Sequence, residues 1–92
     1  MTFLETLDQL LQSRLERPKD GSYTSSLFEQ GVDRIARKVG EESAELIIAA
    51  KNSDKHEICN EAADLLYHVM VLCREQGVSF SEVVAILEKR HT

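Results

Sequence analysis

Apolar residues recur at intervals of three and four along most of this chain, which is the period of an amphipathic helix. The clearest stripes predict helices at about 3–17, 32–51 and 54–76, and another from 80 toward the end. A short helix is expected before Gly31. No segment alternates convincingly at the two-residue period of a half-buried strand. The sequence therefore predicts one all-α domain of four to five helices over residues 1–92.

The expected helix starts come from capping boxes, in which a Ser, Thr or Asp is followed three positions later by Glu. The four such starts are Thr2, Ser26, Asp54 and Ser79. Pro18 is expected to end the first helix, because the residue before a proline is disfavoured in α conformation. Residues 19–24 are then a polar loop, and Gly77 follows the end of the 54–76 helix.

Composition narrows the class of protein. Hydrophobic residues make up 42% of the chain and aromatic residues only 5%, so an aliphatic core is expected. The formal net charge of −5 argues against general binding to nucleic acid or to anionic membranes. The N-terminus lacks a signal-peptide pattern, and the longest apolar run is too short to span a bilayer. We expect a cytoplasmic protein with no nucleic-acid or membrane partner.

The two cysteines, Cys59 and Cys73, stand fourteen residues apart on one expected helix. That spacing corresponds to about 21 Å along the helix axis, so the two thiols cannot bridge each other. We expect both to be reduced, small, buried apolar residues.

Acidic residues form two groups within the strongest helical stretches. Glu41, Glu42 and Glu45 make an E-E-x-x-E motif, and Glu61 and Asp64 make E-x-x-D. Residues three and four apart share a helix face, so each group projects its carboxylates to one side. The short connection between the two helices makes them antiparallel neighbours. Carboxylate oxygens are ligands that Mg²⁺ prefers. We therefore favour a divalent-metal site over the alternative, a solvated acidic surface.

The 54–76 helix carries a narrow polar seam between apolar flanks. On a helical wheel the seam spans an arc of about 60°. Its members are Glu57, Glu61, Asp64, His68 and Glu75. A solvated face would be broadly polar, whereas such a seam is more typical of a cleft or an ion site. The rest of this helix is apolar over more surface than one small chain can cover, so we expect at least a homodimer whose second subunit completes a four-helix bundle.

Longer motifs surround these acids. The run K-V-G-E-E-S-A-E begins at Lys38, E-A-A-D-L-L-Y-H begins at Glu61, and an R-P…G-S-Y-T loop spans 17–24. Together they resemble the phosphoribosyl-ATP pyrophosphatases of histidine biosynthesis, within the all-α, MazG-like nucleoside triphosphate pyrophosphohydrolases. The acid signature alone is typical of the superfamily, and the loop and flanking residues match the narrower family. The resemblance covers about 4–90 of the chain.

The resemblance implies a MazG-like bundle completed by homodimerisation. It also implies Mg²⁺-dependent hydrolysis of phosphoribosyl-ATP to phosphoribosyl-AMP and pyrophosphate, the second step of the pathway. By the same match, the metal ligands are Glu42, Glu45, Glu61 and Asp64. We expect Glu41 to be either an outer ligand or the base that orients the attacking water. Bare carboxylates would repel a triphosphate, and bound metal offsets that repulsion.

Further residues are candidates for contact with the substrate. Lys38 would either bind phosphate or pair with acids on its own helix, and Lys51 would either bind phosphate or remain solvated. His68 would hydrogen-bond a ligand carboxylate or serve only the structure. Three loop residues are expected to touch substrate, with simple turn chemistry as the alternative. They are Ser22, Tyr23 and Thr24.

Two other functions remain open from the sequence. One is a house-cleaning pyrophosphatase that acts on a nucleoside or deoxynucleoside triphosphate, and the G-S-Y-T loop disfavours it. The other is a non-catalytic helical dimerisation module, which the acidic seam disfavours. A calcium-binding EF-hand is excluded, because the acids lie on expected helices and no loop carries the required pattern.

Overall fold

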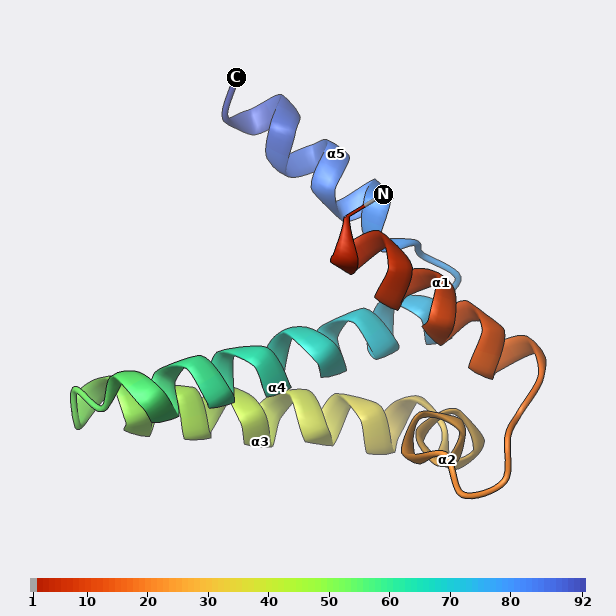
Figure 1. Cartoon of the computed structure of the whole chain (residues 1–92), viewed down its shortest axis with the longest axis horizontal. Helices are drawn as coiled ribbons and strands as arrows, with labels where there is room; N and C mark the ends of the chain where they lie inside the picture. The colour runs from red at the N-terminus through yellow and green to blue at the C-terminus, as the bar shows by residue number, and fades with distance from the viewer. Residues whose placement is uncertain (1) are drawn as a thin grey trace.

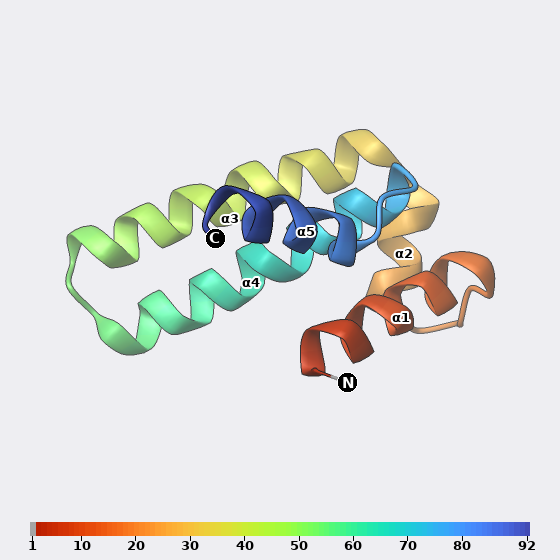
Figure 2. The ribbon, with the colours of Figure 1, turned by 90° about the horizontal axis from the view of Figure 1, so that it is seen from above.

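The computed structural model describes residues 2–92, and within this range the chain folds into helices without strands. The helices are α1 (Phe3–Glu16), α2 (Tyr23–Gln30), α3 (Val32–Lys51), α4 (Lys55–Glu75) and α5 (Phe80–Arg90). The long helices α3 and α4 form an antiparallel hairpin, and α1 and α2 lie at the open end of that hairpin (Figure 1). α5 rises away from the hairpin (Figure 1), and seen from above it is directed toward the side on which the hairpin turns (Figure 2). The predicted all-α class is confirmed.

Side-chain caps open four of the helices. Thr2, Ser22, Asp54 and Ser79 each accept a hydrogen bond from the backbone N–H three residues later. The predicted cap at Ser26 is wrong, since the residue that caps α2 is Ser22, four positions earlier. Gly21 adopts a φ of 81°, which closes the turn after Pro18 and places Ser22 in the capping position. The Ser26 hydroxyl instead donates to the Tyr23 carbonyl at 2.6 Å, inside the helix.

The core joins the first four helices at the open end of the hairpin. Fully buried side chains come from α1, α2, α3 and α4: Leu11, Leu27, Ile35, Met70 and Val71. All five are aliphatic or thioether side chains, as the composition predicts. The α4 members lie in its C-terminal half, so the N-terminal half of α4 packs chiefly against α3. Position on that N-terminal half explains why Cys59 is exposed, against the prediction that it is buried. Both cysteines are free thiols, as expected.

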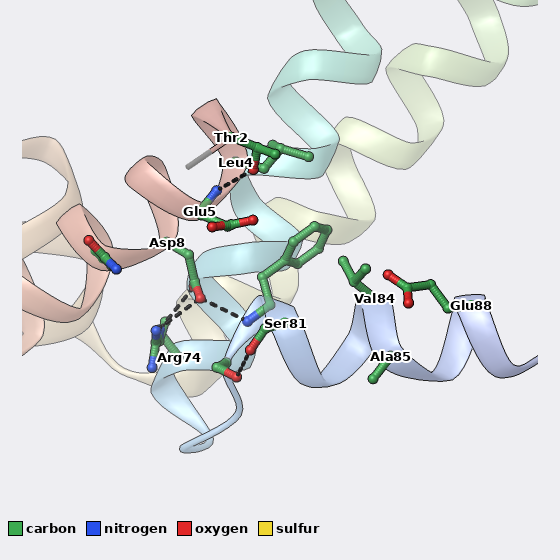
Figure 3. A pocket seen from close by; sticks show the side chains of 12 residues that line it. Thr2, Leu4, Glu5, Asp8, Arg74, Ser81, Val84, Ala85 and Glu88 are labelled. Atoms are coloured by element: carbon green, nitrogen blue, oxygen red, sulfur yellow. Dashed lines mark hydrogen bonds and ion pairs between the residues drawn. The ribbon is translucent and has the colours of Figure 1, made fainter.

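An ion pair between the buried Asp8 and the partly buried Arg74 fixes α1 to the junction of α4 and α5. The Arg74 guanidinium donates two hydrogen bonds of 2.9 Å to the two carboxylate oxygens of Asp8 (Figure 3). The backbone N–H of Phe80 donates to the same carboxylate at 3.0 Å, at the first turn of α5. A cavity of about 650 Å³ lies beside this pair, between α1 and α5. Asp8 therefore sets the direction in which α5 leaves the body of the protein.

Several large apolar side chains remain exposed. They include Ile47, Ile48, Leu66, Ile86 and Leu87, with exposed fractions from 37% to 61%. No residue of α5 is buried. None of the described helices is long and apolar enough to cross a membrane.

Candidate metal centre

The α3–α4 hairpin brings together three of the four carboxylates that were expected to hold a metal. One oxygen from each of Glu42, Glu45 and Glu61 lies within 4.8 Å of the other two. Glu42 and Glu45 are three residues apart on α3, so they share a face, and Glu61 meets them from α4. Glu42 is buried, Glu61 is half-buried and Glu45 is exposed. We call these three residues the acidic cluster.

Two carboxylate oxygens of the acidic cluster lack hydrogen-bond partners. Glu42 Oε2 and Glu61 Oε2 are buried, and neither has a hydrogen-bond partner. A buried polar atom without a partner costs folding free energy, and the cost is larger for a charged group. A hard divalent cation would satisfy both oxygens, since Mg²⁺ takes a few carboxylate oxygens and keeps waters in its remaining positions. The residues present therefore fit such an ion.

The raised pKa of Glu61 also indicates that the acidic cluster favours a bound cation. Hydrogen bonding with Glu45, then burial, then the charges of Glu45, Asp64 and Glu42 raise the pKa of Glu61 from 4.5 to about 7. Without a cation, the cluster therefore retains a proton on Glu61 near neutral pH. A proton held between close carboxylates is a sign that positive charge is favoured there.

The acidic cluster opens onto a cavity of about 220 Å³ near the turn between α3 and α4. Glu45 and Glu61 line it together with Glu57, Ile48 and Asn52. The predicted seam of α4 thus faces a hollow over its first two turns. Substrate phosphate groups and water could approach the cluster from this side.

The other acids that the sequence singled out lie at the border of the cluster. Glu41 and Asp64 are both exposed, and neither belongs to the group of converging oxygens. Asp64 is one turn after Glu61, close enough for its charge to raise the Glu61 pKa. Glu41 pairs with Lys38, whose ammonium lies 3.4 Å from its carboxylate.

Lys38 is held by acids of its own helix. Its ammonium lies 3.3 Å from Glu42 Oε1, and its side chain is 19% exposed. Burial lowers the pKa of Lys38, but hydrogen bonding to Glu42, the nearby Tyr23 and pairing with Glu41 outweigh burial and raise it above 10.5. Lys38 is therefore charged at neutral pH. Lys51, the other expected phosphate ligand, is exposed at the end of α3.

The expected loop residues belong to the start of α2, where they meet α4. The Tyr23 hydroxyl lies 3.0 Å from His68 Nε2, and His68 Nδ1 lies 2.7 Å from the main-chain carbonyl of Asp64. A carbonyl only accepts, so the neutral ring carries its proton on Nδ1 and Tyr23 donates to Nε2. His68 therefore bonds the backbone of Asp64 rather than a carboxylate side chain. Ser22 caps α2.

One participant was not singled out from the sequence. The hydroxyls of Tyr67 and Thr24 form a hydrogen bond that joins α4 to α2. In the sequence, Tyr67 stood out only as a member of the E-A-A-D-L-L-Y-H run that begins at Glu61. Its place immediately before His68 was the available signal, because neighbouring helix residues can face the same neighbouring element.

Comparison with known proteins identifies close relatives. The family model "Phosphoribosyl-ATP pyrophosphohydrolase" matches residues 4–91. A protein of Streptococcus gordonii named phosphoribosyl-ATP pyrophosphatase is 56% identical over 87 residues, which cover 95% of this chain and 84% of that protein. One of Leptospira biflexa with the same name is 49% identical over the full length of both chains. The histidine biosynthesis bifunctional protein HisIE of Halalkalibacterium halodurans is 52% identical over 88 residues, 42% of its length.

Proposed function

Because the chain belongs to the phosphoribosyl-ATP pyrophosphohydrolase family, we propose that it hydrolyses phosphoribosyl-ATP to phosphoribosyl-AMP and pyrophosphate in histidine biosynthesis, with Mg²⁺ held by the acidic cluster. The observation that carries the metal assignment is the convergence of three carboxylates, two of which have buried oxygens without partners. The predicted family is confirmed by relatives that match nearly the whole chain.

The acidic cluster suits the charge problem of this reaction. When bound, Mg²⁺ offsets the negative charge of the phosphate oxygens and of the transition state. Glu42 is the most buried member, and Lys38 holds one of its oxygens. Glu45 and Glu61 face the 220 Å³ cavity, where phosphate and water enter. We assign Asp64 as a fourth ligand, since it is exposed one turn beyond Glu61.

Other residues have roles around the acidic cluster. Glu41 is exposed next to Glu42 and serves as an outer ligand or as the base that orients the attacking water. Lys38 and Lys51 are proposed to contact phosphate. The start of α2 is proposed to contact the substrate, through Ser22, Tyr23 and Thr24. Of these, Tyr23 is 49% exposed.

A homodimer in the cytoplasm is part of the proposal. Ile47 and Ile48 on α3 and Leu66 on α4 expose apolar surface, as do Ile86 and Leu87 on α5. An 11-residue helix such as α5, with no buried residue, gains little stability from its own chain. A second copy packed on the hairpin would cover this surface and complete a four-helix bundle.

The proposed reaction is tested by measuring pyrophosphate release with Mg²⁺. Phosphoribosyl-ATP is offered beside ATP, dCTP and dUTP, and each assay is repeated with EDTA. Turnover of phosphoribosyl-ATP alone, lost in EDTA, is the expected result. Turnover of a deoxynucleotide instead would favour the house-cleaning function, and no turnover of any of the four would favour the dimerisation module.

A further inference from the structure

Two neighbouring residues of α4 are hydrogen-bonded to two neighbouring residues of α2. The Tyr23 hydroxyl donates to His68 Nε2 at 3.0 Å, and the hydroxyls of Tyr67 and Thr24 bond each other. Each contact joins residues more than forty positions apart in the sequence. Tyr67 lies opposite Thr24, and its neighbour His68 lies opposite Tyr23. We call them the α2–α4 tie.

Tyr67 is placed to act on α2 rather than on a ligand. Its ring centroid lies 6.3 Å from that of Tyr23, nearly parallel at 25°, and 4.9 Å from that of His68, nearly perpendicular at 85°. The half-buried side chain packs against the core. Burial raises the pKa of Tyr67, and the hydrogen bond to Thr24 lowers it by less. The pKa is therefore above its ordinary value, and the hydroxyl remains protonated. The ring is thus fixed, and its one polar atom is engaged with Thr24.

The start of α2 needs such an anchor. The helix has eight residues, fewer than an isolated helix needs for stability in water. It follows a polar turn in which Gly21 has a positive φ. The segment is joined to the border of the acidic cluster, because the Tyr23 hydroxyl bonds His68 Nε2 at 3.0 Å and His68 Nδ1 bonds the main-chain carbonyl of Asp64 at 2.7 Å. The position of α2 therefore sets the distance between the proposed substrate-contacting residues and the acidic cluster.

We propose that Tyr67 is a positioning residue for the reaction: its hydroxyl bond to Thr24 holds the start of α2 in the place where substrate binds. This inference rests on the proposed function, since it assigns a task to the substrate-contacting segment. If the bond is absent, the segment samples more positions, and substrate has to order it on binding. That cost raises KM. The acidic cluster and the metal dependence of catalysis are left unchanged.

Tyr67→Phe removes only the hydroxyl and keeps the ring packing. We expect KM for phosphoribosyl-ATP to rise about threefold to tenfold, the range that loss of one net hydrogen bond gives. We expect kcat and the Mg²⁺ concentration for half-maximal activity to stay within about twofold, since one bond outside the cluster is changed. Thr24→Val should raise KM as well, and Thr24→Ser, which keeps the hydroxyl, should raise it less.

A double-mutant cycle tests whether the hydroxyls of Tyr67 and Thr24 affect KM through their shared hydrogen bond or independently of each other. If the two hydroxyls act through their shared bond, Tyr67→Phe combined with Thr24→Val raises KM no further than the worse single variant. Ser79→Ala serves as the matched control, because it removes the side-chain cap of α5 and lowers the melting temperature away from α2. The control is expected to keep the KM of the unsubstituted protein.

Hydrogen exchange gives a readout that does not need turnover. Tyr67→Phe should speed amide exchange at 25–27, in the first turns of α2, and leave the centre of α3 unchanged. Unchanged exchange at 25–27, an unchanged KM, or additive effects in the cycle would each overturn the positioning role. No turnover by the unsubstituted protein would overturn the proposed function and the kinetic role with it, while faster exchange would still show that Tyr67 anchors α2.

Discussion

The ammonium of Lys38 lies 3.3 Å from Oε1 of Glu42, while Oε2 of the same carboxylate is buried without a hydrogen-bond partner. The two oxygens of Glu42 therefore face different surroundings. One is neutralised by a lysine on its own helix, and the other is buried without a partner in a residue that converges with Glu45 and Glu61. This division explains how a buried carboxylate is tolerated and why one of its oxygens is available to a cation.

Replacement of Glu42 tests that division. Glu42→Gln removes the anionic ligand but keeps the shape of the side chain. At saturating Mg²⁺ we expect kcat/KM for phosphoribosyl-ATP to fall by at least about a hundredfold, since metal stabilisation of the transition state is worth several kcal/mol. Glu88→Gln, an exposed change on α5, is the matched control and should keep full activity. Near-normal turnover by Glu42→Gln would remove Glu42 from the ligand set.

The raised pKa of Glu61 predicts a pH dependence of stability in metal-free protein. The folded pKa of about 7 exceeds the ordinary value of 4.5, so the native state binds more protons than the unfolded state between these values. The Glu61 contribution to stability is therefore fully present below about pH 4.5 and is lost as pH rises through about 7. Glu61→Gln removes this dependence.

Urea unfolding in EDTA, followed at several pH values from about 5 to about 8, measures the effect. The advantage of Glu61→Gln over the unsubstituted protein should grow with pH across this range. Added Mg²⁺ should then stabilise the unsubstituted protein more than the variant, because binding to the folded state raises stability by mass action. A difference between the two proteins that does not change with pH would contradict the coupling of Glu61 to its neighbours.

The ion pair of Asp8 and Arg74 predicts a large effect on stability away from the acidic cluster. Asp8→Ala leaves the Arg74 guanidinium and the Phe80 N–H without their acceptor. Loss of Asp8 leaves the partly buried guanidinium without its partner, which costs about 1–3 kcal/mol in the free energy of unfolding. Glu5→Ala, an exposed change on the same helix, should cost no more than about 0.5 kcal/mol. Equal urea midpoints for the two variants would show that the pair contributes little.

The exposed apolar surface predicts self-association through the hairpin. Ile47 is 61% exposed on α3, so Ile47→Glu places a charge where the second copy is proposed to pack. We expect the unsubstituted protein to sediment as a dimer and Ile47→Glu to shift toward monomer. Gln30→Glu, on exposed surface at the end of α2, should remain dimeric. Sedimentation of the unsubstituted chain as a monomer at all concentrations would contradict the proposed assembly.

Much of the fold was predictable because local rules and tertiary packing agree. The long helices α3 and α4 have strong apolar periodicity, and the cap at Asp54 and the glycine at Gly77 lie where the sequence places them. The start of α2 was predicted wrongly because Ser26 is followed three positions later by Glu, whereas Ser22, the serine that caps the helix, is not. The turn at Gly21 decides between them, and its positive φ depends on the path of the whole 17–22 segment.

The site was predictable as a set of acids but not as an arrangement. Helix periodicity places Glu42 and Glu45 on one face, and the hairpin brings Glu61 to them. Periodicity does not say which acids converge, so it did not separate Asp64 from the three that do. The α2–α4 tie could not be predicted from the sequence for a related reason. A contact between Thr24 and Tyr67 depends on how α2 crosses α4, which no local pattern encodes.

The central claim is that the acidic cluster holds the metal on which hydrolysis depends. The most direct test is the Mg²⁺ dependence of pyrophosphate release from phosphoribosyl-ATP, compared between the unsubstituted protein and Glu45→Gln. Glu45 is exposed, so its replacement should not disturb folding. We predict that the variant needs at least about tenfold more Mg²⁺ for half-maximal activity, the scale on which ligand changes alter metal affinity. Superimposable Mg²⁺ curves for the two proteins would contradict the claim.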